Sequence, residues 1–284
     1  MKILSFGEIL FDIFGEESKI GGAPFNFAAH ATRAGAEAYL MSAVGLDELG
    51  DIAIQKAEHH KVRAEYISRS DRYGTGVCRV TLDGKGMPQY NLVSPAAYDD
   101  IPFNSDIIDR RFDGLYFGTL ALRDNSNRRT LEKVISCCDW GEIFVDVNVR
   151  APFCNKESLL LAFENATIVK ISDEELPFVM QEVFSLSSYE VREAMETIVK
   201  RFARIKLVIV TCGADGSVVY DKMKDKFYSC PAVKTEVVST VGAGDSFAAT
   251  FMVNYMNGEP IFECMQKASR ISAYVVSQTE AIPE

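Results

Sequence analysis

The chain has 284 residues, of which 48% are hydrophobic and 25% are charged, a composition typical of a globular protein with a sizeable core. Its formal net charge of −10 argues against nucleic acid or an anionic membrane surface as a partner. Charges interrupt the apolar runs, and the acidic N-terminal segment is unlike a signal peptide, so we expect a cytoplasmic protein without a membrane span.

The first sixty residues alternate between strand and helix patterns. A strand is expected from Ile3 to Ile9, and two glycines at 21–22 precede a helix with a face of small residues. A strand over 39–44 and a helix over 47–60 follow. This order is typical of an α/β protein.

Residues 75–93 have a different character. Apolar and polar side chains alternate there, and Gly84-Lys85-Gly86 predicts the turn of an antiparallel hairpin with one exposed face. Such a hairpin does not fit a simple doubly wound sheet. Residues 74–101 could form a small β-sheet lid or an extension of the sheet edge, with further strands supplied from about 12–20, and the alternating pattern favours the lid.

From residue 114 onward the alternation of strands and helices returns, which predicts a parallel sheet covered by helices. The predicted class is therefore α/β, with one domain over residues 1–284 built on a central, mostly parallel sheet. The strands are expected over 115–118, 143–147, 166–171 and 207–211, the helices at about 126–136, 157–164, 173–181, 188–203 and 261–276, and a second hairpin over 217–229.

The cysteines and histidines suggest no metal or disulfide chemistry. The seven cysteines form no C-x-x-C pair, and His30, His59 and His60 lack the spacing of a metal site. We expect free cysteines in the core and histidines that are exposed or hydrogen-bonded.

A pair of glycines lies where an extended or irregular segment, Val233–Val238, passes into a helix. Backbone at Gly242 and Gly244 can approach a ligand closely, and the first N–H groups of a helix bind anions, phosphate above all. Asp245 lies at the same edge. A carboxylate beside a phosphate site suggests phosphoryl transfer to a hydroxyl group, although a plain tight turn remains an alternative. The third glycine of the dinucleotide fingerprint and the Walker A pattern are both missing from the chain, which disfavours a nicotinamide-dependent dehydrogenase.

The full string around these glycines carries a family resemblance. Thr240-x-Gly242-Ala243-Gly244-Asp245-Ser246-Phe247 closely resembles the signature of ribokinase-like (PfkB) sugar kinases, and the resemblance spans nearly the whole chain. It implies a ribokinase-like fold, ATP and Mg²⁺ as cofactors, and Asp245 as the catalytic base. It also implies an anion hole formed by the amides of Gly242, Ala243 and Gly244. Ser239 stands where the family usually has an Asp that helps to hold a monovalent cation, which leaves potassium activation open.

Two further segments resemble sugar-binding parts of this family. Gly21-Gly22-Ala23-Pro24-Phe25-Asn26 is similar to its first signature, which implies that Gly21, Gly22 and Asn26 contact the sugar together with Asp12. A glycine turn in which Asn26 caps the next helix is the alternative.

A buried-type strand ends in Asp146-Val147-Asn148-Val149-Arg150. Polar side chains at the carboxyl end of a parallel strand face the crevice where ligands bind. This segment resembles the fructokinase and 2-keto-3-deoxygluconate kinase branches, which implies that Asn148 binds sugar and Arg150 meets sugar or phosphate. A structural ion pair between Asp146 and Arg150 is the alternative.

Two segments resemble nucleotide-binding parts of the family. In the first segment, Lys170-Ile171-Ser172-Asp173-Glu174-Glu175, Ser172 replaces the usual Asn and Glu175 is implied to organise magnesium through water, although a helix cap explains the segment equally well. The second segment, Thr211-Cys212-Gly213-Ala214-Asp215-Gly216, could also be a plain turn between strands. The residues implied to contact the nucleotide are Lys170, Ser172, Glu175, Thr211, Gly213 and Gly216.

The resemblance implies an ATP-dependent sugar kinase. Segments within 75–101 resemble fructokinases, so the predicted reaction phosphorylates D-fructose at its 6-hydroxyl. The alternatives are a 2-keto-3-deoxygluconate kinase, another PfkB sugar kinase, and a non-catalytic sugar- or nucleotide-sensing protein of the same fold. Expected partners are a small sugar, ATP and a second copy of the chain bound through the lid. The exact sugar and the oligomeric state stay open.

Overall fold

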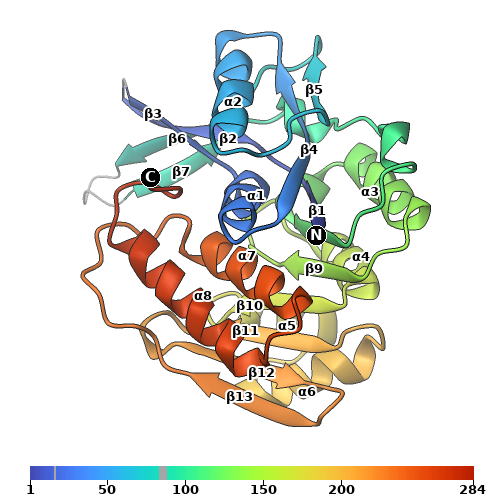
Figure 1. Ribbon diagram of the computed structural model, residues 1–284, viewed down its shortest axis with the longest axis vertical. Coiled ribbons are helices and arrows are strands. Elements are labelled where there is room, and N and C mark those ends of the chain that lie inside the picture. The colour runs from blue at the N-terminus through green and yellow to red at the C-terminus, as the bar shows by residue number, and fades with distance from the viewer. Residues whose placement is uncertain (16, 83–87) are drawn as a thin grey trace.

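Two β-sheets organise the molecule (Figure 1), which the computed structural model describes over residues 1–15, 17–82 and 88–284. The large sheet has nine strands in the order β13-β12-β11-β10-β9-β8-β1-β4-β5. These are β1 (Lys2–Phe6), β4 (Glu37–Gly45), β5 (Ile67–Ser70), β8 (Gly114–Gly118), β9 (Glu142–Asp146), β10 (Ile168–Ser172), β11 (Leu207–Thr211), β12 (Ser217–Asp221) and β13 (Lys226–Cys230). All neighbours from β5 to β11 are parallel, whereas the β11–β12 and β12–β13 pairs are antiparallel.

Helices cover both faces of the large sheet, and this confirms the predicted α/β class. Helices α1, α2, α7 and α8 pack in one apolar core, and α3 to α6 pack in a second core on the opposite face. Parallel strands buried on both faces explain why β1 and β8 read as nearly continuous apolar runs. The helices are α1 (Ala23–Arg33), α2 (Glu48–His59), α3 (Asn125–Cys137), α4 (Lys156–Asn165), α5 (Leu176–Phe184), α6 (Val191–Arg201), α7 (Ala243–Met256) and α8 (Ile261–Val276).

The small sheet is separate from the large one, as the alternating pattern predicted. Its order is β3-β2-β6-β7, so the segment near 12–20 and the hairpin after residue 75 do pair with each other. The predicted turn Gly84-Lys85-Gly86 lies outside the described residues. The strands are β2 (Leu10–Phe14), β3 (Glu17–Gly21), β6 (Gly76–Leu82) and β7 (Pro88–Leu92).

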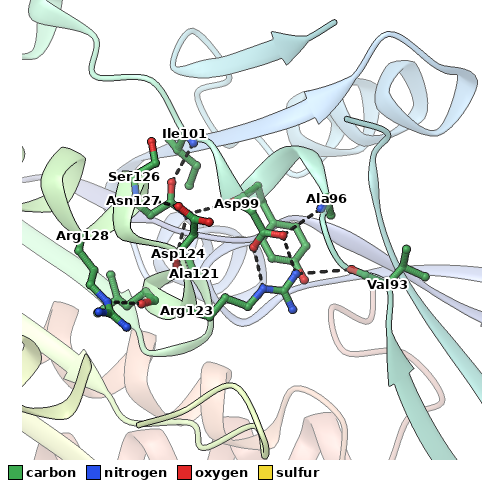
Figure 2. A network of polar contacts seen from close by, with 12 residues as sticks. Val93, Ala96, Asp99, Ile101, Ala121, Arg123, Asp124, Ser126, Asn127 and Arg128 are labelled. Carbon is green, nitrogen blue, oxygen red and sulfur yellow. Dashed lines mark hydrogen bonds and ion pairs between the residues drawn. The ribbon is translucent and has the colours of Figure 1, made fainter. Parts of the chain in front are cut away.

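A buried ion pair joins the exit of the small sheet to the large sheet (Figure 2). Arg123 donates to both carboxylate oxygens of Asp99, at 2.7 Å through Nε and 2.8 Å through Nη2, and the Ala96 N–H also donates to Asp99. Asp99 lies in the short helix η1 (Ala97–Asp99) after β7, whereas Arg123 ends η3 (Leu120–Arg123) after β8. The network therefore fixes where the small sheet leaves the body of the protein.

Other expectations have mixed outcomes. All seven cysteines are free, and buried His30 is hydrogen-bonded through Nε2 to the Ala281 carbonyl at 2.8 Å.

The segment 233–238 forms no strand: it is irregular, and Val237 is 62% exposed. Its β-branched residues suggested a strand, but the segment does not pair with β13, which stays the last strand of the large sheet. Within the described ranges, no helix combines the length and apolarity needed to cross a bilayer.

Candidate active site

The N-terminus of α7 presents free backbone donors. Gly242 caps the helix with φ +80°, and a Cβ atom there would lie 2.7 Å from the Ala281 carbonyl oxygen. The Ala243 N–H donates to the Thr240 carbonyl at 3.3 Å, whereas among the described residues no hydrogen-bond acceptor meets the N–H of Gly244 or Asp245. Of the three amides expected in the anion hole, Ala243 is therefore already engaged, and the Asp245 N–H is available in addition.

Asp245 is held by a side chain more than two hundred residues away in sequence. The Asn26 Nδ2 donates to Asp245 Oδ2 at 2.8 Å where α1 packs on α7. Burial raises the pKa of Asp245, and the hydrogen bond from Asn26 and the charges of Lys170 and Arg150 lower it in part. A helix N-terminus alone would make this carboxylate a weaker base, and burial counteracts that effect.

The alternative role of Asn26 as a helix cap is wrong. The N-cap of α1 is Gly22, with φ +106°, and a Cβ atom there would lie 2.5 Å from the Glu8 carbonyl oxygen. Asn26 lies one turn further along and is only 3% exposed. Asn26 therefore lies inside the helix, and its amide faces Asp245 on α7.

A buried ion pair lies beneath the α7 N-terminus. Lys170 Nζ is 2.9 Å from both carboxylate oxygens of Asp146, and a Cβ atom at Gly244 would lie 3.2 Å from the same Nζ. Burial lowers the pKa of Lys170, but the charges of Asp146 and Glu175 outweigh it, so the pKa is raised and the ammonium stays charged. The alternative of a structural ion pair between Asp146 and Arg150 is wrong, because the neighbouring strand β10 brings Lys170 opposite Asp146.

Glu175 connects two loops at the carboxyl ends of the strands. Its Oε1 accepts from the Val149 N–H at 2.7 Å and its Oε2 from the Ser172 N–H at 2.9 Å, while its own N–H donates to Ser172 Oγ. Ser172 ends β10 and is not the N-cap of α5, which is Glu175, so the predicted cap at Ser172 is wrong although the two residues do bond each other. Glu175 also fixes the loop that carries Asn148 and Arg150. Asn148 has φ +44°, a conformation uncommon for a side chain other than glycine.

Arg150 remains available for an anion. It is exposed, and no carboxylate of the described chain lies within ion-pair distance of it. The small sheet contributes Asp12, whose pKa is raised by burial and lowered in part by Cys78 and Arg150. A Cβ atom at Gly21 would lie 3.2 Å from Asp12 Oδ2, so a glycine there leaves this carboxylate room.

The turn after β11 lies beside the cap of α5. Thr211 is in register with Ser172 on the neighbouring strand, and η4 (Gly213–Asp215) follows directly. Gly216 has φ +99°, and a side chain there would collide with the Cys230 carbonyl of β13. Packing against β13 therefore requires this glycine whether or not a nucleotide binds. This agrees with the alternative interpretation of the segment as a turn between strands.

Glu8 is a buried carboxylate at this edge of the sheet that no sequence motif singled out. It follows β1, is 3% exposed, and its Oε2 has no hydrogen-bond partner in the described part of the chain. Burial raises its pKa to about 7. The only sequence signal is an acidic side chain directly after an apolar strand, at the sheet edge where ligands bind.

Comparison with known proteins identifies the family. The model of the pfkB family carbohydrate kinases matches residues 4–284. The chain is 25% identical to fructokinase-2 of Oryza sativa subsp. japonica, over 99% of this chain and 90% of the relative. It is also 25% identical to the ATP-dependent 6-phosphofructokinase of Thermoanaerobacterium thermosaccharolyticum, over 99% of this chain and 89% of the relative.

A solved structure shares the whole architecture. An uncharacterized sugar kinase of Pyrococcus horikoshii in complex with ATP superposes with a TM-score of 0.80 and 25% identity, covering 99% of this chain and 94% of that chain. The fold, its small separate sheet and the match over nearly all residues agree with the signature around Asp245. The chain belongs to the pfkB family of carbohydrate kinases.

Proposed function

We propose that the protein transfers the γ-phosphate of ATP to the 6-hydroxyl group of D-fructose. The observation that carries this proposal is the buried Asp245 carboxylate, oriented by Asn26 and adjacent to the free N–H groups at the start of α7. A base beside a set of anion-binding donors suits phosphoryl transfer to a hydroxyl group.

In this mechanism the sugar hydroxyl donates to Asp245, which orients it and accepts its proton. The N–H groups of Gly244 and Asp245, with Arg150, stabilise charge on the transferring phosphoryl group, and Lys170 adds positive charge from beneath Gly244. Mg²⁺ carried by the nucleotide neutralises the charge of its phosphate groups when bound. Each Glu175 oxygen accepts one backbone N–H and retains a lone pair, so this carboxylate fits a role toward a magnesium-bound water. The nucleotide-side contacts we propose are Lys170, Ser172, Glu175, Thr211, Gly213 and Gly216.

The small sheet acts as a lid over the sugar in this proposal, with Asp12, Gly21 and Gly22 on the sugar side. Phe14 of this sheet and Val93 directly after it are each 40% exposed, which makes this part of the molecule a candidate surface for a second copy of the chain. Light scattering at micromolar concentration tests this dimer, and a monomer would contradict it.

Charge in the site favours a neutral sugar over a keto-deoxy acid. Lys170 and Arg123 are both engaged by buried carboxylates, which leaves Arg150 as the one site cation without a carboxylate partner in the described structure. Asp12 and Asp245 have raised pKa values, so the pocket already disfavours negative charge. A substrate carboxylate would add charge to such a pocket.

We therefore expect kcat/KM to be higher for D-fructose than for 2-keto-3-deoxygluconate. Both are measured with one enzyme preparation by coupled detection of ADP, with fructose 6-phosphate included because a relative is a 6-phosphofructokinase. A higher value for either acidic substrate would reject fructose and leave a sugar kinase. Absence of sugar-dependent ADP formation across hexoses, pentoses, keto-deoxy acids, nucleosides and sugar phosphates would instead favour a sensing protein.

Gly244→Val should impair turnover more than sugar binding. The added side chain would press on Lys170 Nζ rather than on the ligand, which disturbs the ion pair beneath the phosphate site. Gly244→Ala is the matched control, because its single Cβ requires a shift of only a few tenths of an ångström. Calorimetry of sugar and nucleotide binding, with kcat, separates the effects. Normal kcat in both variants would show that this segment does not support the phosphoryl group.

A further inference from the structure

Unpaired buried polar atoms are concentrated around Glu8. In the described residues, nine buried side-chain nitrogen or oxygen atoms have no hydrogen-bond partner, and five of them belong to this region. Leaving such atoms unpaired in the interior costs free energy, so their concentration in one place points to a ligand with several hydroxyl groups. The five atoms are Glu8 Oε2, Asn26 Oδ1, Tyr98 OH, Tyr116 OH and Arg123 Nη1.

Glu8 is the one carboxylate in this set, and groups from several elements face it. It leaves β1 at the carboxyl end of the sheet, and its backbone is packed against Gly22. Charged and titratable groups on η1, β8, η3, the loop after β9 and α7 interact electrostatically with Glu8, namely Tyr98, Tyr116, Arg123, Arg150 and Asp245. Glu8 thus lies where these elements meet, close enough to Asp245 for the two carboxylates to interact electrostatically.

A purely structural role explains only part of this arrangement. The backbone N–H groups of Glu8 and Ala23 face the carboxyl group and stabilise its charged form, so Glu8 supports the start of α1. The second oxygen, Oε2, is left without a donor. A hydroxyl group is a donor that fits this oxygen, and the proposed sugar substrate supplies several.

We propose that Glu8 is a sugar-binding residue whose Oε2 accepts a hydrogen bond from a hydroxyl group of the sugar other than the one that faces Asp245. This inference deepens the sugar-kinase proposal and rests on it. Glu8, Asn26 and Asp12 then surround the acceptor from the large sheet, α1 and the lid. The competing explanation is an ordered water on Oε2 with no contact to the sugar.

The role predicts a pH dependence of sugar binding. With its pKa near 7, Glu8 is a carboxylate above neutrality and becomes protonated as the pH falls. The carboxylate is the stronger acceptor, so KM for the sugar should rise as pH decreases through about 7. Asp245 controls turnover, so kcat should follow a different profile.

The test compares Glu8→Gln with Glu142→Gln. Glu142 is the matched control, because its Oε2 is also buried without a partner but it begins β9, at the opposite end of the strand from the site. The acceptor is D-fructose, or the sugar of highest kcat/KM if the screen finds a better one. We expect Glu8→Gln to raise KM by roughly 10- to 100-fold with kcat within about threefold, and to abolish the pH dependence of KM, while Glu142→Gln matches the wild type.

Deoxy analogues of the acceptor locate the hydroxyl group. One analogue should bind the wild type more weakly, and Glu8→Gln should lose that discrimination. An unchanged KM in a folded Glu8→Gln protein would assign Oε2 to water and overturn the proposal. A Glu8→Gln variant in which kcat falls and KM does not change would overturn it as well. If this variant fails to fold, the wild-type pH profile decides, because a KM independent of pH between 6 and 8 also overturns it. Failure to phosphorylate any sugar would reject the proposed function instead, and calorimetric sugar binding to both proteins would still test Glu8.

Discussion

Asp245→Asn should lower kcat by about 10²- to 10⁴-fold with little change in stability, the range typical for loss of a general base. The amide keeps the size of the side chain and can still contact Asn26, but it cannot accept the hydroxyl proton. Burial raises the pKa of Asp245 and makes it a better base than an exposed carboxylate at a helix N-terminus. Single-turnover kinetics with ATP and the preferred sugar measure the effect.

Asp51→Asn is the control for this prediction. Asp51 also lies in the first turn of a helix, α2, but its side chain is exposed and pairs with Arg69 instead of facing Asn26 and Lys170. Its loss should leave kcat unchanged. If Asp245→Asn retains near wild-type turnover, Asp245 has no part in proton transfer and the mechanism needs another base.

Lys170→Met should destabilise the protein by about 3–5 kcal/mol, because it leaves a buried carboxylate without its partner. The side chains of Lys170 and Asp146 are only 6% and 2% exposed, so water cannot replace the lost ammonium. In the variant the folded-state pKa of Asp146 should lie above its unfolded value. The destabilisation should then decrease as the pH falls through that raised pKa, because protonation removes the uncompensated charge.

Urea denaturation at several pH values measures this effect, with the double variant Asp146→Asn/Lys170→Met as control. Removing both charges should restore much of the lost stability, because no unpaired ion remains. Turnover should stay low in the double variant if Lys170 contributes charge beneath Gly244. A single variant as stable as the wild type would mean that water or Arg150 compensates Asp146.

Much of this protein could be predicted from local sequence. Apolar runs between helical patterns predict a parallel sheet, because strands buried on both faces need no polar residues. Alternation after residue 75 predicts a separate sheet, since one face of such strands meets solvent. Glycines ahead of α7 predict an anion-binding terminus, because positive φ and bare backbone are properties of a few neighbouring residues.

Partners in the site were decided only by the tertiary structure. Asn26 contacts Asp245 because α1 packs on α7, and Asp146 pairs with Lys170 rather than Arg150 because β9 and β10 are neighbours in register. Glu8 carries no local signal beyond its place after β1, and its unpaired oxygen exists only because several elements bury it together. Spacing along a chain determines which groups occur at each strand end, whereas strand order and helix packing determine which of those groups meet.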